Sequence, residues 1–478
     1  MAILDVLIIF GYMALLICIG VWVSRSVKTN EDAVVAGKSF GAFSAAVGKT
    51  ANLAGGPTVV GGAGYGYSYG FGGSWFLLSS MVTSWISAPF APRIWKAMHR
   101  GHLVSIGGYI GHRFGKFSHV FAGITNGLAY TGFVAAQIVA TGTLINVLLG
   151  WDLNVAMIFS TVVVMGYTIL GGLKAVIYND WVQMTIMIVG FFFILMPVTI
   201  TKAGGWNAML DTVPAAYLQW GNMGWLHIIG SIILPTALAG FTMQATYAYI
   251  GAAKDVKASW TSSILAGFLY LIIAAGVLLV GMATFTLVPG INDQQALATA
   301  ILKFLPHGLI GLLLAAVLSA TMSTAASCSI SAATNINNDV IEPLFGKAPT
   351  EKALLRTRIL IVCVTLVALG FAVLYPQIIG LLLLGYAFGA GGLLVPVLAT
   401  MFWKRATSPG VIASMLGGGI SYVVLSKLVT WPPLFVSIPV SLVLLVVISL
   451  MTPAQDPRQY AIYFDEEWNK HYPDREVL

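Results

Sequence analysis

The chain has 478 residues, of which 58% are hydrophobic and only 9% are charged, and its formal net charge is +7. A water-soluble globular chain carries roughly 25% charged residues, so this composition excludes a protein whose whole surface faces water. Apolar runs of about 20 residues, long enough to cross a bilayer, recur along the sequence. These runs are continuous rather than alternating, which predicts helices and not a β-barrel.

In chain order, the apolar runs predict about thirteen membrane-spanning helices. We expect them near residues 2–24, 43–70, 73–98, 117–149, 154–172, 179–200, 225–252, 258–288, 306–339, 354–374, 377–402, 408–428 and 433–452. The first run lacks the basic start and small-residue exit of a cleavable signal, so we expect a retained helix. Between the spans, residues 99–116 predict a basic, Gly-rich loop and residues 292–304 a helical cap on the outer side. The charged residues 465–478 are expected to be solvated.

The Lys and Arg residues sort unequally when the predicted spans alternate across the bilayer. One side collects most of them, whereas the other collects only Lys202, Lys303 and Lys427. Cytoplasmic loops carry the excess of positive charge, so we expect a multi-pass protein of the inner (plasma) membrane with its N-terminus outside and its C-terminus in the cytoplasm. Because this sorting accounts for the positive net charge, the lipid bilayer and not nucleic acid is the expected partner.

Two of the predicted spans are interrupted. The second contains Pro57 and five Gly residues between positions 51 and 64, and the seventh contains Pro235, Gly240 and the polar run 242–246. Proline removes a backbone donor, and each glycine weakens a helix by roughly 1 kcal/mol. The offset of five spans between the interruptions is what a 5+5 inverted repeat would give, and transporters of that kind place their sites at such interruptions. The alternative is that the glycines only allow close helix packing.

The ninth span carries a dense run of hydroxyl side chains between residues 318 and 331. Ser323 and Thr324 follow Ala320 by one helical turn, so their hydroxyls stand on the same face as its carbonyl. A small hard cation stripped of water is bound by about six oxygens, and carbonyls freed by the interruption of the second span would add to this set. The alternative is that the hydroxyls only pack or bond to their own helix.

These motifs resemble the sodium:solute symporter family, whose members transport sugars, proline, pantothenate, sialic acid, iodide or carboxylates. The pattern Ala320-x-x-Ser323-Thr324 matches the sodium-binding signature of that family. Residues 106–115 are similar to its cytoplasmic L-x-x-R-[YF]-G segment, and residues 251–255 resemble its AAK[SD] turn. The resemblance extends over nearly the whole chain.

The resemblance implies an all-α membrane protein with a LeuT-type core of two inverted five-helix repeats, one extra N-terminal helix and two extra C-terminal helices. The corresponding parts are an N-terminal helix with a cytoplasmic linker (1–42), the first repeat (43–200), the second repeat with an outer loop (201–402), two C-terminal helices (403–452) and a cytoplasmic tail (453–478). A monomer is favoured.

Sodium is the cofactor that the resemblance implies. Through Gly61, Gly64, Tyr67 and Gly70, the second span is similar to the family helix that donates two sodium-ligating carbonyls. The implied Na+ ligands are Ala51, Ala54, Ala320, Ser323 and Thr324. No catalytic residue is implied, and no H-E-x-x-H, G-x-S-x-G or P-loop motif occurs in the sequence, so we do not expect an enzyme.

Three further residues are candidates for a second ion site or for coupling, namely Asp180, Ser327 and Lys49. Asp180 and Ser327 match a second site of some family members, although Ala326 replaces an expected serine. A carboxylate within a membrane is a functional candidate by default, but Asp180 could instead cap a helix. A buried ammonium at Lys49 would repel a bound cation. It either snorkels to the cytoplasmic face, pairs with Asp180, or replaces sodium as the balancing charge in a proton-coupled variant.

The resemblance further implies sodium-coupled symport of a small solute by alternating access. We expect the substrate site to be lined by Gly55, Gly56, Thr58, Gln137, Gln244 and Tyr247. This set has no acid that would balance an organic cation, and N–H groups freed at a helix break favour a carboxylate. A small organic acid or zwitterion is therefore the expected solute. The alternatives are a proton-coupled or sodium-independent symporter of the same fold, or a transporter-like sensor.

Overall fold

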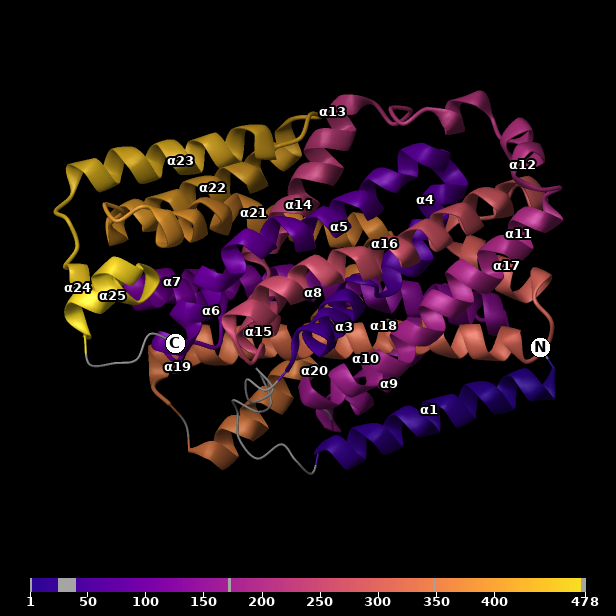
Figure 1. The fold of residues 1–478 in the computed structure, drawn as a ribbon, viewed down its shortest axis with the longest axis horizontal. Coiled ribbons are helices and arrows are strands. Elements are labelled where there is room, and N and C mark those ends of the chain that lie inside the picture. Colours follow the sequence, from indigo (N-terminus) through magenta and orange to yellow (C-terminus); the bar gives the residue numbers. More distant parts are fainter. Residues whose placement is uncertain (1, 25–39, 171–172, 348, 474–478) are drawn as a thin grey trace.

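The computed structural model describes residues 2–24, 40–170, 173–347 and 349–473. Within these ranges the chain is helical, apart from one isolated bridge between Phe40 and Ala253. Most helices run along the long axis of the molecule, with the N-terminus at one end and the C-terminal helices towards the other (Figure 1). In the described part of the chain, nine helices are long and apolar enough to cross a membrane. Long apolar runs have thus become long helices, as the bilayer requires.

Eight of the predicted spans are single helices: α1 (Ile3–Ser24), α8 (Lys116–Leu149), α9 (Leu153–Leu170), α16 (Val256–Leu287), α20 (Thr350–Leu374), α21 (Ile378–Phe402), α22 (Ser408–Leu428) and α23 (Leu434–Met451). Three others change pitch along their length. They consist of α5 (Ser74–Ser87) with α6 (Ala91–Arg100), α10 (Leu173–Met187) with α11 (Met196–Lys202), and α18 (Leu309–Thr334) with α19 (Glu342–Phe345). Each of these helices lies within or close to a range that the sequence predicts.

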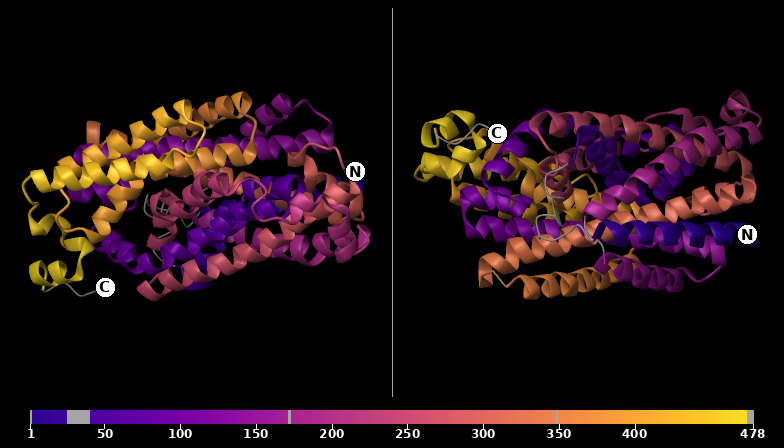
Figure 2. Two further views of the ribbon diagram at one scale, coloured as in Figure 1. Left: turned by 90° about the horizontal axis from the view of Figure 1, so that it is seen from above. Right: turned by 60° about the horizontal axis from the view of Figure 1, so that its bottom comes forward.

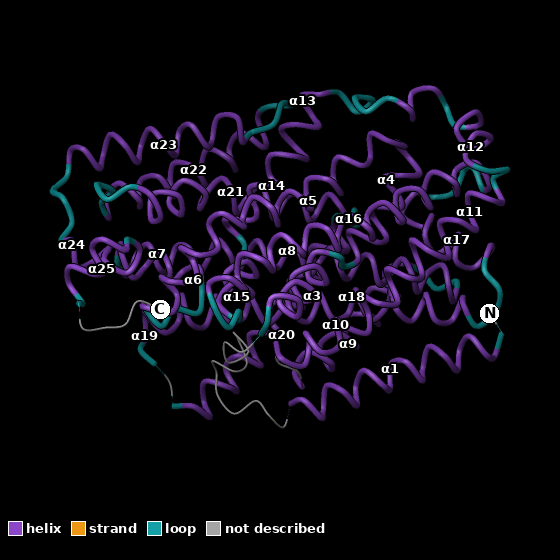
Figure 3. The backbone as a smooth tube through the Cα atoms, in the orientation of Figure 1, coloured by secondary structure: helices purple, strands orange, loops and turns teal. Residues whose placement is uncertain are grey.

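The two predicted interruptions are confirmed. The second span divides into α3 (Ala42–Leu53), a wide turn at Pro57–Gly61 and α4 (Gly62–Tyr69). The seventh consists of α13 (Trp225–His227), a wide turn at Ile228–Ile233, α14 (Leu234–Thr242) and α15 (Gln244–Gly251). Between α14 and α15, Met243 has an extended backbone, with φ −85° and ψ 131°. Figure 3 shows that most of the backbone is helical, with loops and turns in short stretches between the helices.

Short helices cover both ends of the molecule (Figures 1 and 2). α12 (Trp206–Thr212) and α17 (Ala296–Phe304) lie at the end that holds the N-terminus, which confirms the helical character expected for residues 292–304. The opposite end carries α7 (Ile106–Phe114), α24 (Pro457–Tyr460) and α25 (Asp465–His471). The predicted loop 99–116 therefore contains a helix, which begins where the Ser105 hydroxyl accepts a hydrogen bond from the Gly108 N–H.

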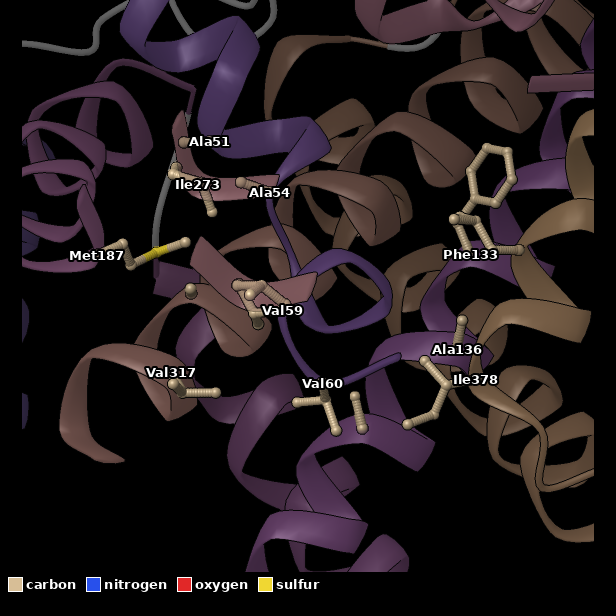
Figure 4. Close-up of a cluster of buried hydrophobic side chains, with 14 of the residues drawn as sticks. Ala51, Ala54, Val59, Val60, Phe133, Ala136, Met187, Ile273, Val317 and Ile378 are labelled. Carbon is tan, nitrogen blue, oxygen red and sulfur yellow. The ribbon is translucent and has the colours of Figure 1, made fainter. Parts of the chain in front are cut away.

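The helices α8 and α18 form the centre of the bundle. In their apolar windows, 72% and 83% of the residues are buried, against 28% for α20, α22 and α23. The largest apolar cluster surrounds the interruption after α3 and includes Ala51, Ala54, Val59 and Val60 of the second span with Val317 and Ile378 (Figure 4). The peripheral helices expose their apolar side chains instead, as expected for surfaces that face lipid.

The C-terminal segment packs against the protein through a few apolar side chains, whereas most described residues from 465 onwards are exposed or half-buried, in line with the prediction for 465–478. Tyr460, Ile462, Tyr463 and Trp468 are buried in an apolar cluster that also contains residues of α6 and α7. Beside them, Asp465 accepts hydrogen bonds of 2.7 Å from both Lys96 and Arg100 of α6. Three buried aromatic residues, of which Trp468 lies within the predicted stretch 465–478, thus anchor a segment whose composition is charged.

The contacts of Asp465 predict a pH-dependent docking of α25. Burial raises the pKa of Asp465, but the hydrogen bonds from Lys96 and Arg100 outweigh it and hold the pKa below its ordinary value. A lowered pKa in the docked state means that docking gains stability above the ordinary carboxylate pKa and loses it as the pH falls through the lowered pKa. We expect hydrogen exchange in residues 461–472 to rise over that acidic range.

In Asp465→Asn, exchange in residues 461–472 should already be faster at neutral pH. The change should be modest, because exposed ion pairs contribute about 0.2–1 kcal/mol. The exposed carboxylate Asp211 of α12 provides a matched control, since Asp211→Asn should leave exchange in this segment unchanged. Equal exchange in Asp465→Asn and the parent would show that the aromatic contacts alone hold α25.

Candidate functional site

The break after α3 is shaped by two glycines that allow it to approach α8 and α18. A Cβ atom at Gly56 would lie 2.4 Å from the Cβ of Ala140. One at Gly55 would lie 2.8 Å from both Gln137 Nε2 and Thr324 Oγ1. Any larger residue would push the break away from both helices, so glycine is required here by close packing rather than by an unusual φ.

The break leaves backbone polar groups that side chains satisfy. The Gly56 N–H donates to Gln137 Oε1 over 2.8 Å, and the Leu53 carbonyl accepts from Thr58 Oγ1 over 2.6 Å. Thr58 Oγ1 also lies 2.9 Å from the hydroxyl of Tyr270. The sequence predicted Gly55, Gly56, Thr58 and Gln137 as neighbours, and the structure brings these four together, with Tyr270 as a partner that the sequence did not indicate.

The predicted ion-site residues meet on the α3 side of the same break. Thr324 Oγ1 of α18 donates to the Ala51 carbonyl of α3 over 3.4 Å, and Ser323 Oγ donates to Asp180 Oδ1 of α10 over 3.2 Å. Asp180 is only 2% exposed, and its Oδ2 has no hydrogen-bond partner among the described residues. Three helices thus place a carboxylate, a carbonyl and two hydroxyls in one buried cluster.

Such an oxygen set suits a hard cation. Carboxylate, carbonyl and hydroxyl oxygens are the ligands that hard cations prefer, whereas softer metals take His and Cys. Among the described residues, no group of three or more His, Cys, Asp or Glu is arranged to hold a metal ion. Ala54 and Ala320, the other two predicted ligands, are buried in the break and in α18.

Ser327 and Asn52 extend this cluster by one helical turn. Asn52 Nδ2 donates to Ser327 Oγ over 3.0 Å, and Ser327 Oγ donates to the Thr324 carbonyl over 3.0 Å. The sequence predicted Ser327 but missed Asn52, although an amide side chain between apolar residues at the end of α3 was the available signal. Asn52 therefore ties α3 to the ion-site helix beside the Thr324 contact.

Lys49 is buried and its ammonium is bound by hydroxyl groups. Its side chain is 6% exposed, and Nζ donates to Ser263 Oγ over 2.7 Å and to Ser87 Oγ over 3.0 Å. It neither reaches the cytoplasmic face nor pairs with Asp180, so two of the three predicted interpretations are not seen. The third interpretation, in which Lys49 replaces sodium as the balancing charge in a proton-coupled variant, stays a prediction.

The break between α14 and α15 is held by α8. Asn126 Nδ2 donates to the Thr242 carbonyl over 2.6 Å, and its Oδ1 accepts from the Gln244 N–H over 3.2 Å. The Ala245 N–H donates to the Tyr130 hydroxyl over 2.7 Å. The sequence indicated neither Asn126 nor Tyr130, because nothing in the sequence distinguishes them from the other polar residues of this long helix.

The structure does not bring the predicted Gln244 and Tyr247 side chains to the first break. The Gln244 amide bonds to backbone of the α6–α7 connection, donating to the Val104 carbonyl and accepting from the Ile106 N–H, both over 2.9 Å. The Tyr247 hydroxyl donates to the Phe241 carbonyl over 3.0 Å. Both side chains are already engaged, so the candidate substrate site reduces to the residues around Gly55 and Gln137.

Comparison with known proteins finds related sequences over most of the chain. The sequence model of the sodium:solute symporter family matches residues 34–418. The chain is 27% identical over 429 residues to the high-affinity proline transporter PutP of Bacillus subtilis, covering 86% of this chain and 89% of that protein. It is 25% identical over 408 residues to the sodium/pantothenate symporter of Haemophilus influenzae, covering 82% and 84%.

Solved structures share the fold. A Na+-coupled sialic acid symporter in a substrate-bound outward-open state superposes with a TM-score of 0.82 at 19% identity, over 95% of this chain and 99% of that chain. The nucleobase-cation-symport-1 transporter Mhp1 in a closed conformation superposes with a TM-score of 0.60 at 12% identity, over 91% and 99%. At these identities, the likeness concerns the arrangement of helices.

The close approach at Gly56 predicts a specific steric coupling. Gly56→Ala should destabilise the protein by about 1–3 kcal/mol, the range typical of overpacking in a well-packed interior, and the measurement is the free energy of unfolding in detergent or nanodiscs. Ala140→Gly should recover part of this loss in the double variant, because it removes the atom that the new methyl meets. Gly370→Ala, where a Cβ would meet nothing within 4 Å, serves as the control. Additive effects of the two substitutions would contradict the steric account.

Proposed function

The chain belongs to the sodium:solute symporter family, and from this premise we propose that it carries one small organic solute across the inner membrane together with Na+, by alternating access. It is a transporter and not an enzyme, and sodium is its cofactor. We further propose about thirteen spans, of which ten form two inverted five-helix repeats. Its N-terminus would lie outside, and its basic loops and C-terminal tail would lie in the cytoplasm. The chain would act as a monomer.

One observation carries the ion part of the proposal, namely the contact of Thr324 with the Ala51 carbonyl beside the contact of Ser323 with Asp180. A hydroxyl that donates one hydrogen bond keeps oxygen lone pairs that a cation can use. We assign the Na+ ligands to the carbonyls of Ala51, Ala54 and Ala320 and to the hydroxyls of Ser323 and Thr324. Asp180 and Ser327 are assigned to a second ion or to coupling.

Sodium bound at this place would join α3 to α18 and α10. An ion held by groups on separate helices stabilises the arrangement in which those groups are close, and it releases that arrangement when it leaves. The energy for uphill transport comes from the ion: one charge that moves down a potential of 100 mV contributes about 2.3 kcal/mol. The concentration gradient of sodium adds to this.

The solute proposed is a small organic acid or zwitterion bound at Gly55, Gly56, Thr58 and Gln137. The Gly56 N–H is a backbone donor at a helix break, now satisfied by a neutral amide oxygen. A carboxylate would make the stronger, charge-assisted bond at that donor. Proline and pantothenate, the solutes of relatives, both carry a carboxylate.

The proposal is tested by a thermal-shift screen followed by uptake. Purified protein is screened against carboxylates and amino acids, with sodium and with choline in its place, and the solute that stabilises most in sodium is then used as radiolabel in proteoliposomes. We expect uptake that an inward sodium gradient drives and that choline abolishes. Uptake that persists in choline and stops with a protonophore would instead favour the proton-coupled alternative, with Lys49 as the balancing charge. Binding without flux would favour a sensor.

Removing the two hydroxyls should abolish the sodium dependence of this uptake. In Ser323→Ala/Thr324→Ala, the site loses two of its proposed ligands, and a fall of at least about tenfold in sodium affinity, about 1.4 kcal/mol, should leave uptake unstimulated at the sodium concentration that half-saturates the parent. Ser331→Ala, two turns further along α18, removes a hydroxyl outside the cluster and should leave the sodium dependence unchanged. Sodium stimulation retained in the double variant would disprove the ion site assigned above.

A further inference from the structure

We infer that Asn126 and Tyr130 of α8 are positioning residues that hold the break at Met243 as a hinge, about which α15 moves relative to α14. This inference rests on the alternating-access cycle proposed above. Neither residue touches the candidate ion or substrate site, so their role differs from that of Gln137, which contacts the first break.

The first support is that α8 satisfies the backbone groups that the second break exposes. Asn126 binds both the Thr242 carbonyl and the Gln244 N–H, one on each side of Met243, and Tyr130 binds the Ala245 N–H. Asn126 and Tyr130 are almost completely buried, at 1% and 0% exposure. Water therefore cannot replace these bonds where the structure holds them, and the break can exist only while it lies against α8.

The second support is that nothing local in the sequence forces a break at Met243. The only proline of this span, Pro235, stands eight residues before Met243, where the wide turn at Ile228–Ile233 passes into α14, and Gly240 is helical. Residues 241–246 contain no proline or glycine and could continue as a helix. The break is thus imposed by tertiary hydrogen bonds, which makes it reversible when α15 shifts on α8.

The third support is the position of α8 relative to both breaks and the ion-site helix. Asn126, Tyr130 and Gln137 are separated by four and seven residues, a spacing that places them on one face of α8. Gln137 binds the first break, and Asn335 Nδ2 of the α18 span lies 3.4 Å from the same Asn126 oxygen that accepts from Gln244. Because Asn126 contacts both Gln244 and Asn335, a shift at the second break would change a contact of the span that carries Ser323 and Thr324.

The native Cys328 provides a reporter for this hinge. It is buried on α18, near Tyr130 of α8 and Tyr249 of α15. In a Cys18→Ser/Cys363→Ser background it is the only thiol of the chain. The purified full-length protein in nanodiscs is labelled with a hydrophilic maleimide, in sodium chloride and in choline chloride, and the labelling rate reports how often α15 leaves α8.

We expect Asn126→Ala and Tyr130→Phe to label about tenfold faster than the parent in choline, the factor that corresponds to the loss of one or two hydrogen bonds. Sodium should slow labelling in the parent and have a smaller effect in both variants. Thr131→Val is the matched control, because the Thr131 hydroxyl on the same helix bonds only to Gly127 of α8, and it should behave as the parent. Melting temperatures verify that each variant is folded.

The outcomes separate the hinge from a purely structural role. A stabilising contact alone would lower the melting temperature without changing the ratio of the rates in sodium and choline, and that result would overturn the inference. So would rates within about twofold of the parent, or an equal change in Thr131→Val. Tyr130→Phe removes a single oxygen and remains informative if Asn126→Ala does not fold. If sodium has no effect on the parent, sodium coupling fails, whereas the comparison of parent and variants in choline still decides the hinge.

Discussion

A backbone polar group left unpaired at membrane depth has no water to bind, and the architecture of this protein follows from where such groups occur. Two spans are broken, after Leu53 and at Met243, and each break exposes N–H and C=O groups. One helix contributes to both breaks, because α8 provides Gln137 to the first break and Asn126 and Tyr130 to the second. This explains why α8 must be central and buried, although its sequence is not the most apolar in the chain. It also explains why glycines line the first break, where the backbone itself has to reach α8.

The buried ionisable side chains Asp180 and Lys49 likewise have hydrogen-bond partners close by. Asp180 and Lys49 are both buried, yet each is bound by hydroxyl groups: Asp180 by Ser323, and Lys49 by Ser87 and Ser263. A direct ion pair between Asp180 and Lys49 would neutralise both charges, and the carboxylate would then attract a cation only weakly. Held apart by hydroxyls, Asp180 retains an oxygen without a partner among the described residues, and the Lys49 amine is bound by Ser87 and Ser263. A separation of this kind costs stability, and proteins keep such arrangements where ions or substrates bind.

The sequence predicted those features that depend on neighbours along the chain. Spans were found because lipid demands long apolar runs, the first break because Pro57 and the glycines destabilise a helix locally, and the Ser323–Thr324 face because helical spacing is fixed. Features that depend on contacts between distant residues were missed or misplaced. Gln244 and Tyr247 looked like site residues from their polarity, but the Val104–Ile106 backbone and Phe241 engage them. The docking of the C-terminal segment was missed, because Lys96 and Arg100, which bind Asp465, lie more than 360 positions earlier.

The two breaks are related by the proposed repeat, but they differ chemically, and this difference assigns them different roles. At the first break, the partners are Gln137 and the hydroxyls of Thr58 and Thr324, side chains that can rotate away when a ligand offers a better bond. At the second break, Asn126 donates to the Thr242 carbonyl and accepts from the Gln244 N–H. The Tyr130 hydroxyl accepts from the Ala245 N–H, so these backbone groups already have partners. A ligand gains most where it replaces a neutral, single hydrogen bond by a charge-assisted one, and this condition is met at Gly56. The first break is therefore suited to binding and the second to movement. Coupling of an ion to a solute requires both a binding site and an element whose position that site influences.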